Sequence, residues 1–419
     1  MSLPVRTLPV VQNWDCHVTG TCCHEYRVTL SPDEVERIES QQWTREELAG
    51  HAPFQHAGPF WKRQTQLNHR PDGACVFLGP EGRCRIHERF GYEAKPLPCR
   101  LFPFVLVPTG DHWRVGLRFA CPSAAANKGR ALPEHQADLR QFANDLARRE
   151  NLQPGPDGSL APPPALDSGE QLDWPDTLRL VDALLKLMRQ GRDPIERRWR
   201  RCLHLAQNMR KARLDAVRGG RLTELVDLLA SSGELDVPAS NALIPPPGWI
   251  GRILFRQAAA LFTRKDHGPN RGLASRGRLA LMGAAYRFTR GAGTVPRLHA
   301  KLPDANFERL EEPVGPLSPE AEAVLERYYL IKIGSLQFVA FGLPFWEGVE
   351  GLAVTLPVIL WVARMFRDRS QAEAITQALV IVDDHVGFNR VLASLRQRLS
   401  FRILARTGEL ERLIAWYAR

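Results

Sequence analysis

The sequence predicts an α+β fold in which a small, irregular, Cys-rich N-terminal module precedes a mostly α-helical domain. Three observations support this prediction. Seven of the eight cysteines lie before residue 122, a Pro/Gly-rich stretch at 151–173 has no apolar periodicity, and the later segments carry apolar residues at helical spacing. We therefore expect a module at residues 1–150, a linker at 151–173 and an all-helical domain at 174–419.

The module contains one clear helix signal and three strand signals. Residues 30–40, LSPDEVERIES, predict a helix that Ser31 caps and that has Pro32 at its first position. Strands are expected at 75–78 (CVFL), 102–108 (FPFVLVP) and 113–120 (WRVGLRFA), and the last two should form a hairpin across 109–112. The cysteines would then lie on loops and strand ends.

The second part of the chain has the apolar spacing of helices. The pattern predicts about eight to ten of them, with the strongest signals at 176–190, 221–232, 318–339, 372–386 and 388–404. The longest apolar run, 334–366, is interrupted by Glu347, Glu350, Pro344 and Pro357. Neither half reaches the roughly 20 residues of a membrane helix. We expect buried core helices and no membrane partner.

The bulk composition is that of an ordinary globular protein, with 44% hydrophobic and 24% charged residues. The first residues, MSLPVRTLPVVQNWD, show no secretory signal, so we expect a cytoplasmic protein. Thiols stay reduced in that compartment, which favours metal binding or catalysis over a disulfide frame. The net charge of +10 is uneven, and the basic stretches at 186–221 and 252–297 would attract anions.

Soft thiolates select zinc, copper(I) or iron-sulfur clusters. The predicted metal ligands are the seven early cysteines: Cys16, Cys22, Cys23, Cys75, Cys84, Cys99 and Cys121. Cys75 and Cys84 flank a GPEG turn, which can bring both sulfur atoms to one point.

Seven thiols exceed the four ligands of a single ion, so the sequence implies two sites, or one site and a cluster. We expect the adjacent Cys22 and Cys23 to point in different directions and to serve different metals. Two four-coordinate sites have eight ligand positions. With seven thiols, one position is open or is filled by another group. The candidates are Thr19, His17, His24 and His87. The alternative is a zinc ion that only stabilises a small module and its interaction surface.

Several motifs, in this order and spacing, resemble the bacterial cysteine-cluster family of zinc- or iron-chelating proteins. They are Cys-x2-Thr-Gly-x-Cys-Cys at 16–23, LSPDEVERI, GACVFL, GRCRIH, PCRLFPF and ACPSAA. That family has a cysteine where this chain has Thr19. Residues 84–104, the total length and the later LERYYLIKI are similar to flagellin lysine N-methylases, the long members of the group.

The resemblance implies a bound zinc or iron ion or an iron-sulfur cluster. For the methylases it also implies transfer of a methyl group from S-adenosylmethionine to the lysine side chain of a protein substrate. Neither the Cys-x3-Cys-x2-Cys spacing of radical enzymes nor the Gly-x-Gly-x-Gly loop of conventional methyltransferases is found. The sequence leaves open whether the chain is an enzyme, and it does not define the oligomeric state.

Four other features have competing interpretations. Arg100, which follows Cys99, would stabilise a thiolate or hold the carboxylate of S-adenosylmethionine, or it is an ordinary surface arginine. Cys202 is expected in the core, and the alternative is an exposed thiol whose pKa the neighbouring arginines lower. The RRWRR segment around Trp199 is expected to pack against acidic residues, although nucleic-acid binding is the alternative. His385 follows two aspartates, and we expect it on a solvated turn rather than as a general base.

Overall fold

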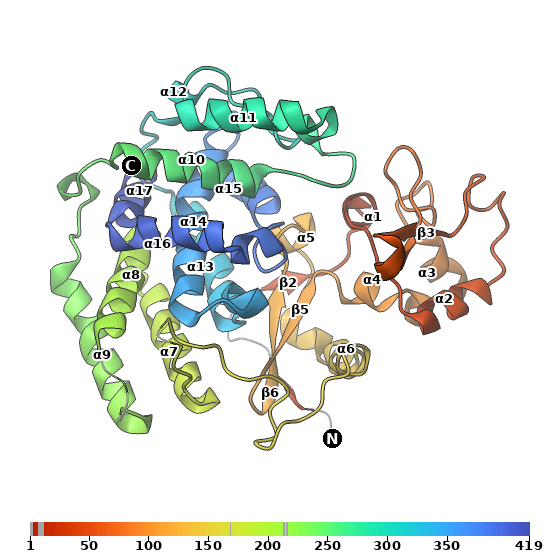
Figure 1. Cartoon of the computed structure of the whole chain (residues 1–419), viewed down its shortest axis with the longest axis horizontal. Helices are drawn as coiled ribbons and strands as arrows, with labels where there is room; N and C mark the ends of the chain where they lie inside the picture. Colours follow the sequence, from red (N-terminus) through yellow and green to blue (C-terminus); the bar gives the residue numbers. More distant parts are fainter. Residues whose placement is uncertain (1–2, 7–11, 168, 213, 215–216) are drawn as a thin grey trace.

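The structure, a computed structural model, describes residues 3–6, 12–167, 169–212, 214 and 217–419. Short strands and helices occupy the chain up to residue 149, and helices dominate from residue 174 onward (Figure 1). The predicted α+β class, with an irregular Cys-rich module before a mostly helical domain, is confirmed.

The N-terminal part consists of short elements joined by loops. Its strands are β1 (Val5–Arg6), β2 (Asn13–Trp14), β3 (Phe54–Ala57), β4 (Gln64–Leu67), β5 (Phe104–Thr109), β6 (His112–Leu117) and β7 (Arg130–Ala131). Its α-helices are α1 (Thr21–Glu25), α2 (Pro32–Glu39), α3 (Arg85–Phe90), α4 (Leu97–Leu101), α5 (Pro122–Ala125) and α6 (Gln136–Arg149).

Two of the predicted elements form as expected. Helix α2 begins after Ser31, whose hydroxyl accepts a hydrogen bond from the Glu34 backbone, while the Glu34 carboxylate accepts one from the Ser31 backbone. This reciprocal pair satisfies donors that the first turn leaves unbonded. Strands β5 and β6 form the expected antiparallel hairpin, with Thr109 opposite His112, and β1 adds to β6 in parallel.

The predicted strand at 75–78 is wrong. Only Cys75 and Leu78 make isolated bridges, to His69 and Cys84, and the residues between them form a turn. A hydrogen bond from the Leu78 backbone to the Cys75 carbonyl, 2.9 Å long, closes that turn. The apolar residues of the segment are buried because the turn packs inward, not because a strand passes through a sheet.

Eleven α-helices, α7 to α17, follow in the part of the chain that is described. They are α7 (Trp174–Met188), α8 (Ile195–Lys211), α9 (Gly219–Asp236), α10 (Trp249–Thr263), α11 (Arg278–Arg290), α12 (Phe307–Leu310), α13 (Pro319–Gly334), α14 (Phe345–Ala363), α15 (Gln371–Val382), α16 (Leu395–Arg406) and α17 (Glu409–Tyr417). Each of the five strong signals in the sequence falls on one of them.

Helix α14 is a single helix of 19 residues, although Pro357 lies inside it. Among the described residues it is the one helix whose length and composition would allow a membrane crossing, yet 94% of its apolar window is buried inside the protein. Glu347 and Glu350 are also buried and form ion pairs with arginines. The expectation of a buried core segment is confirmed.

The buried apolar residues that the structure describes form two separate clusters. The large cluster joins the β5–β6 hairpin, α6 and the helices α7 to α17. The small cluster lies within residues 20–99, which we call the cysteine lobe, and consists of Leu30, Ile38, Leu48, Leu67, Ala74, Cys75, Val76, Phe77, Leu78 and Ile86. Figure 1 shows the cysteine lobe at one end of the molecule.

The Pro/Gly-rich stretch at 151–173 contains no helix or strand among its described residues. It is nevertheless packed, since Leu166 and Leu172 are buried and the Phe345 backbone donates to the Ala165 carbonyl at 2.8 Å. The domain boundary at this stretch stays a prediction.

Helix α8 contains the RRWRR segment at residues 197–201. The side chains of this segment point into the protein. Trp199 and Cys202 are fully buried, as expected for Cys202. Arg201 pairs with Asp193 at 2.9 Å and Arg198 with Glu326 at 2.6 Å. The expected packing against acidic residues is confirmed, and these arginines are not available at the surface.

Candidate metal centre

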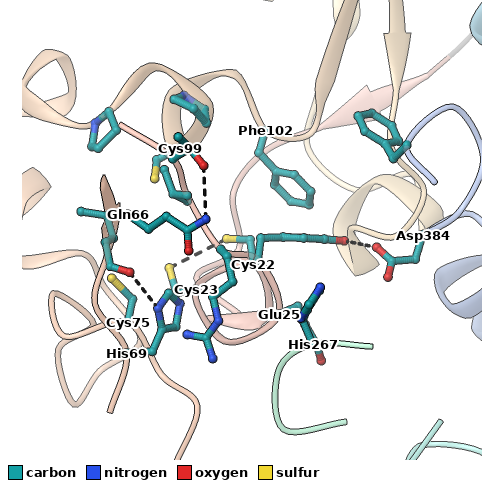
Figure 2. Close-up of a pocket in the computed structure, with 18 of the residues that line it drawn as sticks. Cys22, Cys23, Glu25, Gln66, His69, Cys75, Cys99, Phe102, His267 and Asp384 are labelled. Atoms are coloured by element: carbon teal, nitrogen blue, oxygen red, sulfur yellow. Dashed lines mark hydrogen bonds between the residues drawn. The ribbon is translucent and has the colours of Figure 1, made fainter. Parts of the chain in front are cut away.

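Five of the seven early cysteines line one cavity of about 910 Å³. They come from three separate segments: Cys22 and Cys23 on α1, Cys75 and Cys84 around the GPEG turn, and Cys99 on α4. The opposite wall belongs largely to the helical domain and includes Arg264, Lys265, Asp384, His385 and Phe388. In Figure 2 the thiols of Cys22, Cys23, Cys75 and Cys99 lie on one side, and Asp384 and His267 on the other.

The first helix, α1, brings two thiols together. It starts at Gly20, whose φ of 65° is a left-handed conformation that glycine adopts without strain. The sulfur atoms of Cys22 and Cys23 are then 3.9 Å apart. A tetrahedral zinc ion with Zn–S bonds of about 2.3 Å separates its sulfur ligands by about 3.8 Å. The expectation that these side chains point apart is wrong, because their sulfur atoms lie within contact distance of each other.

The GPEG turn reverses the chain so that Cys84 pairs with Leu78, three residues after Cys75. The Gly79 backbone donates to the Arg83 carbonyl at 2.8 Å, and Leu78 pairs with Cys84. The Cys75 backbone also donates to the Cys23 carbonyl at 2.9 Å, which joins this turn to α1. Local hydrogen bonds thus bring both cysteines to the same cavity, and the meeting of their sulfur atoms at one point stays a prediction.

Burial and mutual contact shift the thiol pKa values in different directions. The hydrogen bond with Cys23 lowers the pKa of Cys22 to about 7 and raises the pKa of Cys23. Burial raises the pKa of Cys75 to about 12 and that of Cys99 well above its ordinary value. Thiolates are the form that binds metal, so a metal ion entering this cavity has to displace protons from most of these groups.

Cys16 and Cys121 do not line the cavity. Cys16 is exposed, and Cys121 is buried at the start of α5. Among the residues that the structure describes, no three His, Cys, Asp or Glu side chains stand close enough together to hold an ion. The five cavity thiols form a soft donor set that suits zinc or iron, but the thiols must turn toward a common point to complete it. The full ligand set stays a prediction.

None of the four candidates for the open position lines the cavity: Thr19, His17, His24 and His87 all lie outside it. A histidine that the sequence analysis did not name, His69, does line it. Its Nδ1 lies 3.1 Å from the Leu67 carbonyl oxygen, and burial lowers its pKa to about 4. The one available signal was its position six residues before Cys75.

A polar network closes the other side of the cavity around Asp384. This carboxylate accepts hydrogen bonds from Lys265 at 2.6 Å, Tyr26 at 2.9 Å and Arg118 at 3.0 Å. Burial alone would raise its pKa, but Lys265 and Arg118 hold it well below its usual range. Lys265 also lies 3.2 Å from the Glu25 carboxylate at the end of α1. The network thus fixes the cysteine lobe to the helical domain.

His385 and Asp383, the neighbours of Asp384, are buried. The His385 Nε2 lies 2.7 Å from the Arg264 carbonyl oxygen, and burial lowers its pKa. The expectation of a solvated turn at His385 is wrong, because the loop after α15 folds back onto Arg264. Asp383 and Lys332 form a fully buried ion pair of 2.6 Å, and Asp383 also accepts from the Phe119 backbone at 2.5 Å.

Arg100 is buried beside two carboxylates and does not line the cavity. It pairs with Glu93 at 2.5 Å and with Asp145 at 3.1 Å. Its guanidinium is therefore occupied by protein groups, and its role as a cofactor ligand stays a prediction.

Residues 15–127 match a family model described as "Putative zinc- or iron-chelating domain" and named CxxCxxCC. The matched range contains all seven early cysteines. The N-terminal part of the chain is therefore similar to this cysteine-cluster family, whose description is metal chelation. No curated protein and no solved structure matches the chain.

Proposed function

We propose that the chain is a metalloprotein whose zinc, iron or iron-sulfur centre is bound by the cavity thiols and faces a substrate site. The observation that carries the proposal is the convergence of five thiols from three segments on one cavity, with the helical domain as its opposite wall. A metal ion that only stabilises the fold needs no adjoining cavity, whereas a catalytic metal ion keeps one coordination position accessible to substrate.

The finer proposal, supported by the resemblance to flagellin lysine N-methylases, is methyl transfer from S-adenosylmethionine to a protein lysine. The carbon–sulfur bond of the sulfonium breaks, a carbon–nitrogen bond forms, and the lysine amine loses a proton. Support comes also from the size of the cavity, since binding sites for cofactors have volumes of about 300–1,000 Å³. Its lining contains both signs of charge, with seven Lys or Arg and three Asp or Glu residues, as a zwitterionic cofactor requires.

The deciding experiment is elemental analysis of the full chain purified without oxygen. Iron with acid-labile sulfide and a brown colour supports an iron-sulfur centre. Zinc or iron without sulfide supports a mononuclear site. Natively folded protein that contains none of these and takes up none on reconstitution would end the proposal. Titration with S-adenosylmethionine, followed by an assay for methylated lysine in a protein substrate, then tests the finer step.

A structural zinc ion is the second candidate, and the small apolar cluster of the cysteine lobe favours it. Only ten residues form that cluster, and small modules of this kind commonly need a metal to remain folded. Colourless protein with stoichiometric zinc, in which a chelator unfolds the lobe and no substrate binds in the cavity, would identify this role.

A further inference from the structure

His69 follows strand β4 and lines the same cavity as the five thiols. It pairs with Cys75 through an isolated bridge, and the Cys75 backbone in turn bonds to the Cys23 carbonyl. The His69 side chain lines the cavity together with these two cysteines. In the view of Figure 2 its ring is drawn next to Cys75 and below the sulfur atom of Cys23.

One nitrogen of the His69 ring is occupied and the other is not. The Nδ1 atom lies 3.1 Å from the Leu67 carbonyl oxygen. A carbonyl oxygen only accepts hydrogen bonds, so Nδ1 carries the proton and the neutral ring keeps a lone pair on Nε2. Among the described residues, this Nε2 atom is buried and has no hydrogen-bond partner.

An unpartnered buried nitrogen is costly. Leaving such a group unsatisfied costs about 1–3 kcal/mol, and native structures keep few of them without a reason. Metal-binding histidines typically have the arrangement seen at His69, in which one ring nitrogen donates to a backbone carbonyl and the other is directed to the metal. The backbone hydrogen bond fixes both the tautomer and the orientation of the ring.

We propose that His69 Nε2 is a ligand of the metal centre, together with thiolates of the cavity. This inference rests on the proposed function. It replaces the open position expected near Thr19 with a nitrogen donor from a different segment. An imidazole in place of a thiolate makes the bound centre one charge less negative, so the mixed ligand set differs in chemistry from an all-cysteine one.

The test uses the full chain, stripped of metal and reloaded with Co²⁺ without oxygen. Absorption reports thiolate-to-cobalt charge transfer, and pulsed electron paramagnetic resonance reports nitrogen bound directly to the metal. The wild type should show both signals. His69→Asn retains an amide donor for the Leu67 carbonyl but removes Nε2. It should lose the nitrogen coupling and bind Co²⁺ at least about tenfold more weakly, while charge transfer remains.

His267→Asn is the matched control, because His267 lines the same cavity but is exposed and comes from the opposite wall. This variant should keep both signals. A loaded wild type with charge transfer but no bound nitrogen overturns the His69 inference without any variant. The inference is also overturned if His69→Asn shows the same nitrogen coupling and the same Co²⁺ affinity as the wild type. A wild type without any charge transfer instead removes the proposed function itself.

Discussion

The attachment of the cysteine lobe to the helical domain should depend on Asp384. This side chain is 16% exposed and accepts from Lys265, Tyr26 and Arg118, which come from three different parts of the chain. The substitution Asp384→Asn keeps the shape and one oxygen acceptor but removes the charge. Lys265, which is 7% exposed, then loses its nearer carboxylate and keeps only Glu25.

The expected cost follows from burial. Removing one partner of a buried ion pair costs about 3–5 kcal/mol, and the remaining contact with Glu25 places this case at the lower end, near 3 kcal/mol. Asp266→Asn is the matched control, because Asp266 pairs with Arg264 at 2.5 Å but both side chains are about 40% exposed. Exposed pairs of this kind contribute about 0.2–1 kcal/mol.

Hydrogen exchange resolved along the chain measures the effect. A loss near 3 kcal/mol should speed exchange of the cysteine-lobe amides about a hundredfold and leave the core of α13 and α14 unchanged. Because the pKa of Asp384 is lowered in the fold, its contribution is present above the unfolded value of about 3.9 and is lost as the pH falls below it. Equal exchange in the two variants at neutral pH would refute the reasoning.

Three further predictions concern the cavity, the core and the response to acid. Cys75→Ala should lower the metal content and destabilise the cysteine lobe, whereas Cys202→Ala, in the core of α8, should leave metal content unchanged by elemental analysis. Lys332→Met leaves the Asp383 carboxylate buried without its cation and should lower the free energy of unfolding in urea by about 3–5 kcal/mol; adding Asp383→Asn should recover part of that loss. His299 has its pKa lowered to about 3, mainly by burial, so only the unfolded chain binds this proton between pH 6.5 and 3. The free energy of unfolding should therefore fall as the pH decreases through that window, and His299→Asn should flatten the decrease.

The elements that local signals define could be predicted from the sequence. Ser31, Pro32 and Glu34 specify the start of α2 through contacts within four residues, and the β5–β6 hairpin needs only two apolar runs and a short turn. The strand expected at 75–78 was wrong because its formation is not decided by local signals. A buried turn accounts for its apolar residues as well as a strand does. Which of the two forms depends on pairing with His69 and Cys84.

The composition of the site could be predicted only in part. The cysteine motifs identified the thiols, but the direction of Cys22 and Cys23 depends on the helical turn that Gly20 starts. The burial of His385 depends on a carbonyl 121 residues earlier in the chain, at Arg264. No local pattern contains the His385 contact, since it arises only when distant segments of the helical domain pack against each other.

The adjacent residues Asp383 and Asp384 explain why the cavity lies where it does. Asp383 faces inward and is fixed by Lys332, with both side chains fully buried, so the end of α15 is held rigidly in the core. Asp384 then presents its carboxylate from this fixed point to Tyr26, next to α1. The small apolar cluster of the lobe is separate from the large one, and the polar contacts around Asp384 add to the few apolar contacts, such as that of Leu97, that hold the lobe to the rest of the protein. A bound anion that draws Lys265 or Arg118 away from Asp384 would weaken these contacts, and occupancy of the cavity is therefore linked energetically to the position of the thiols.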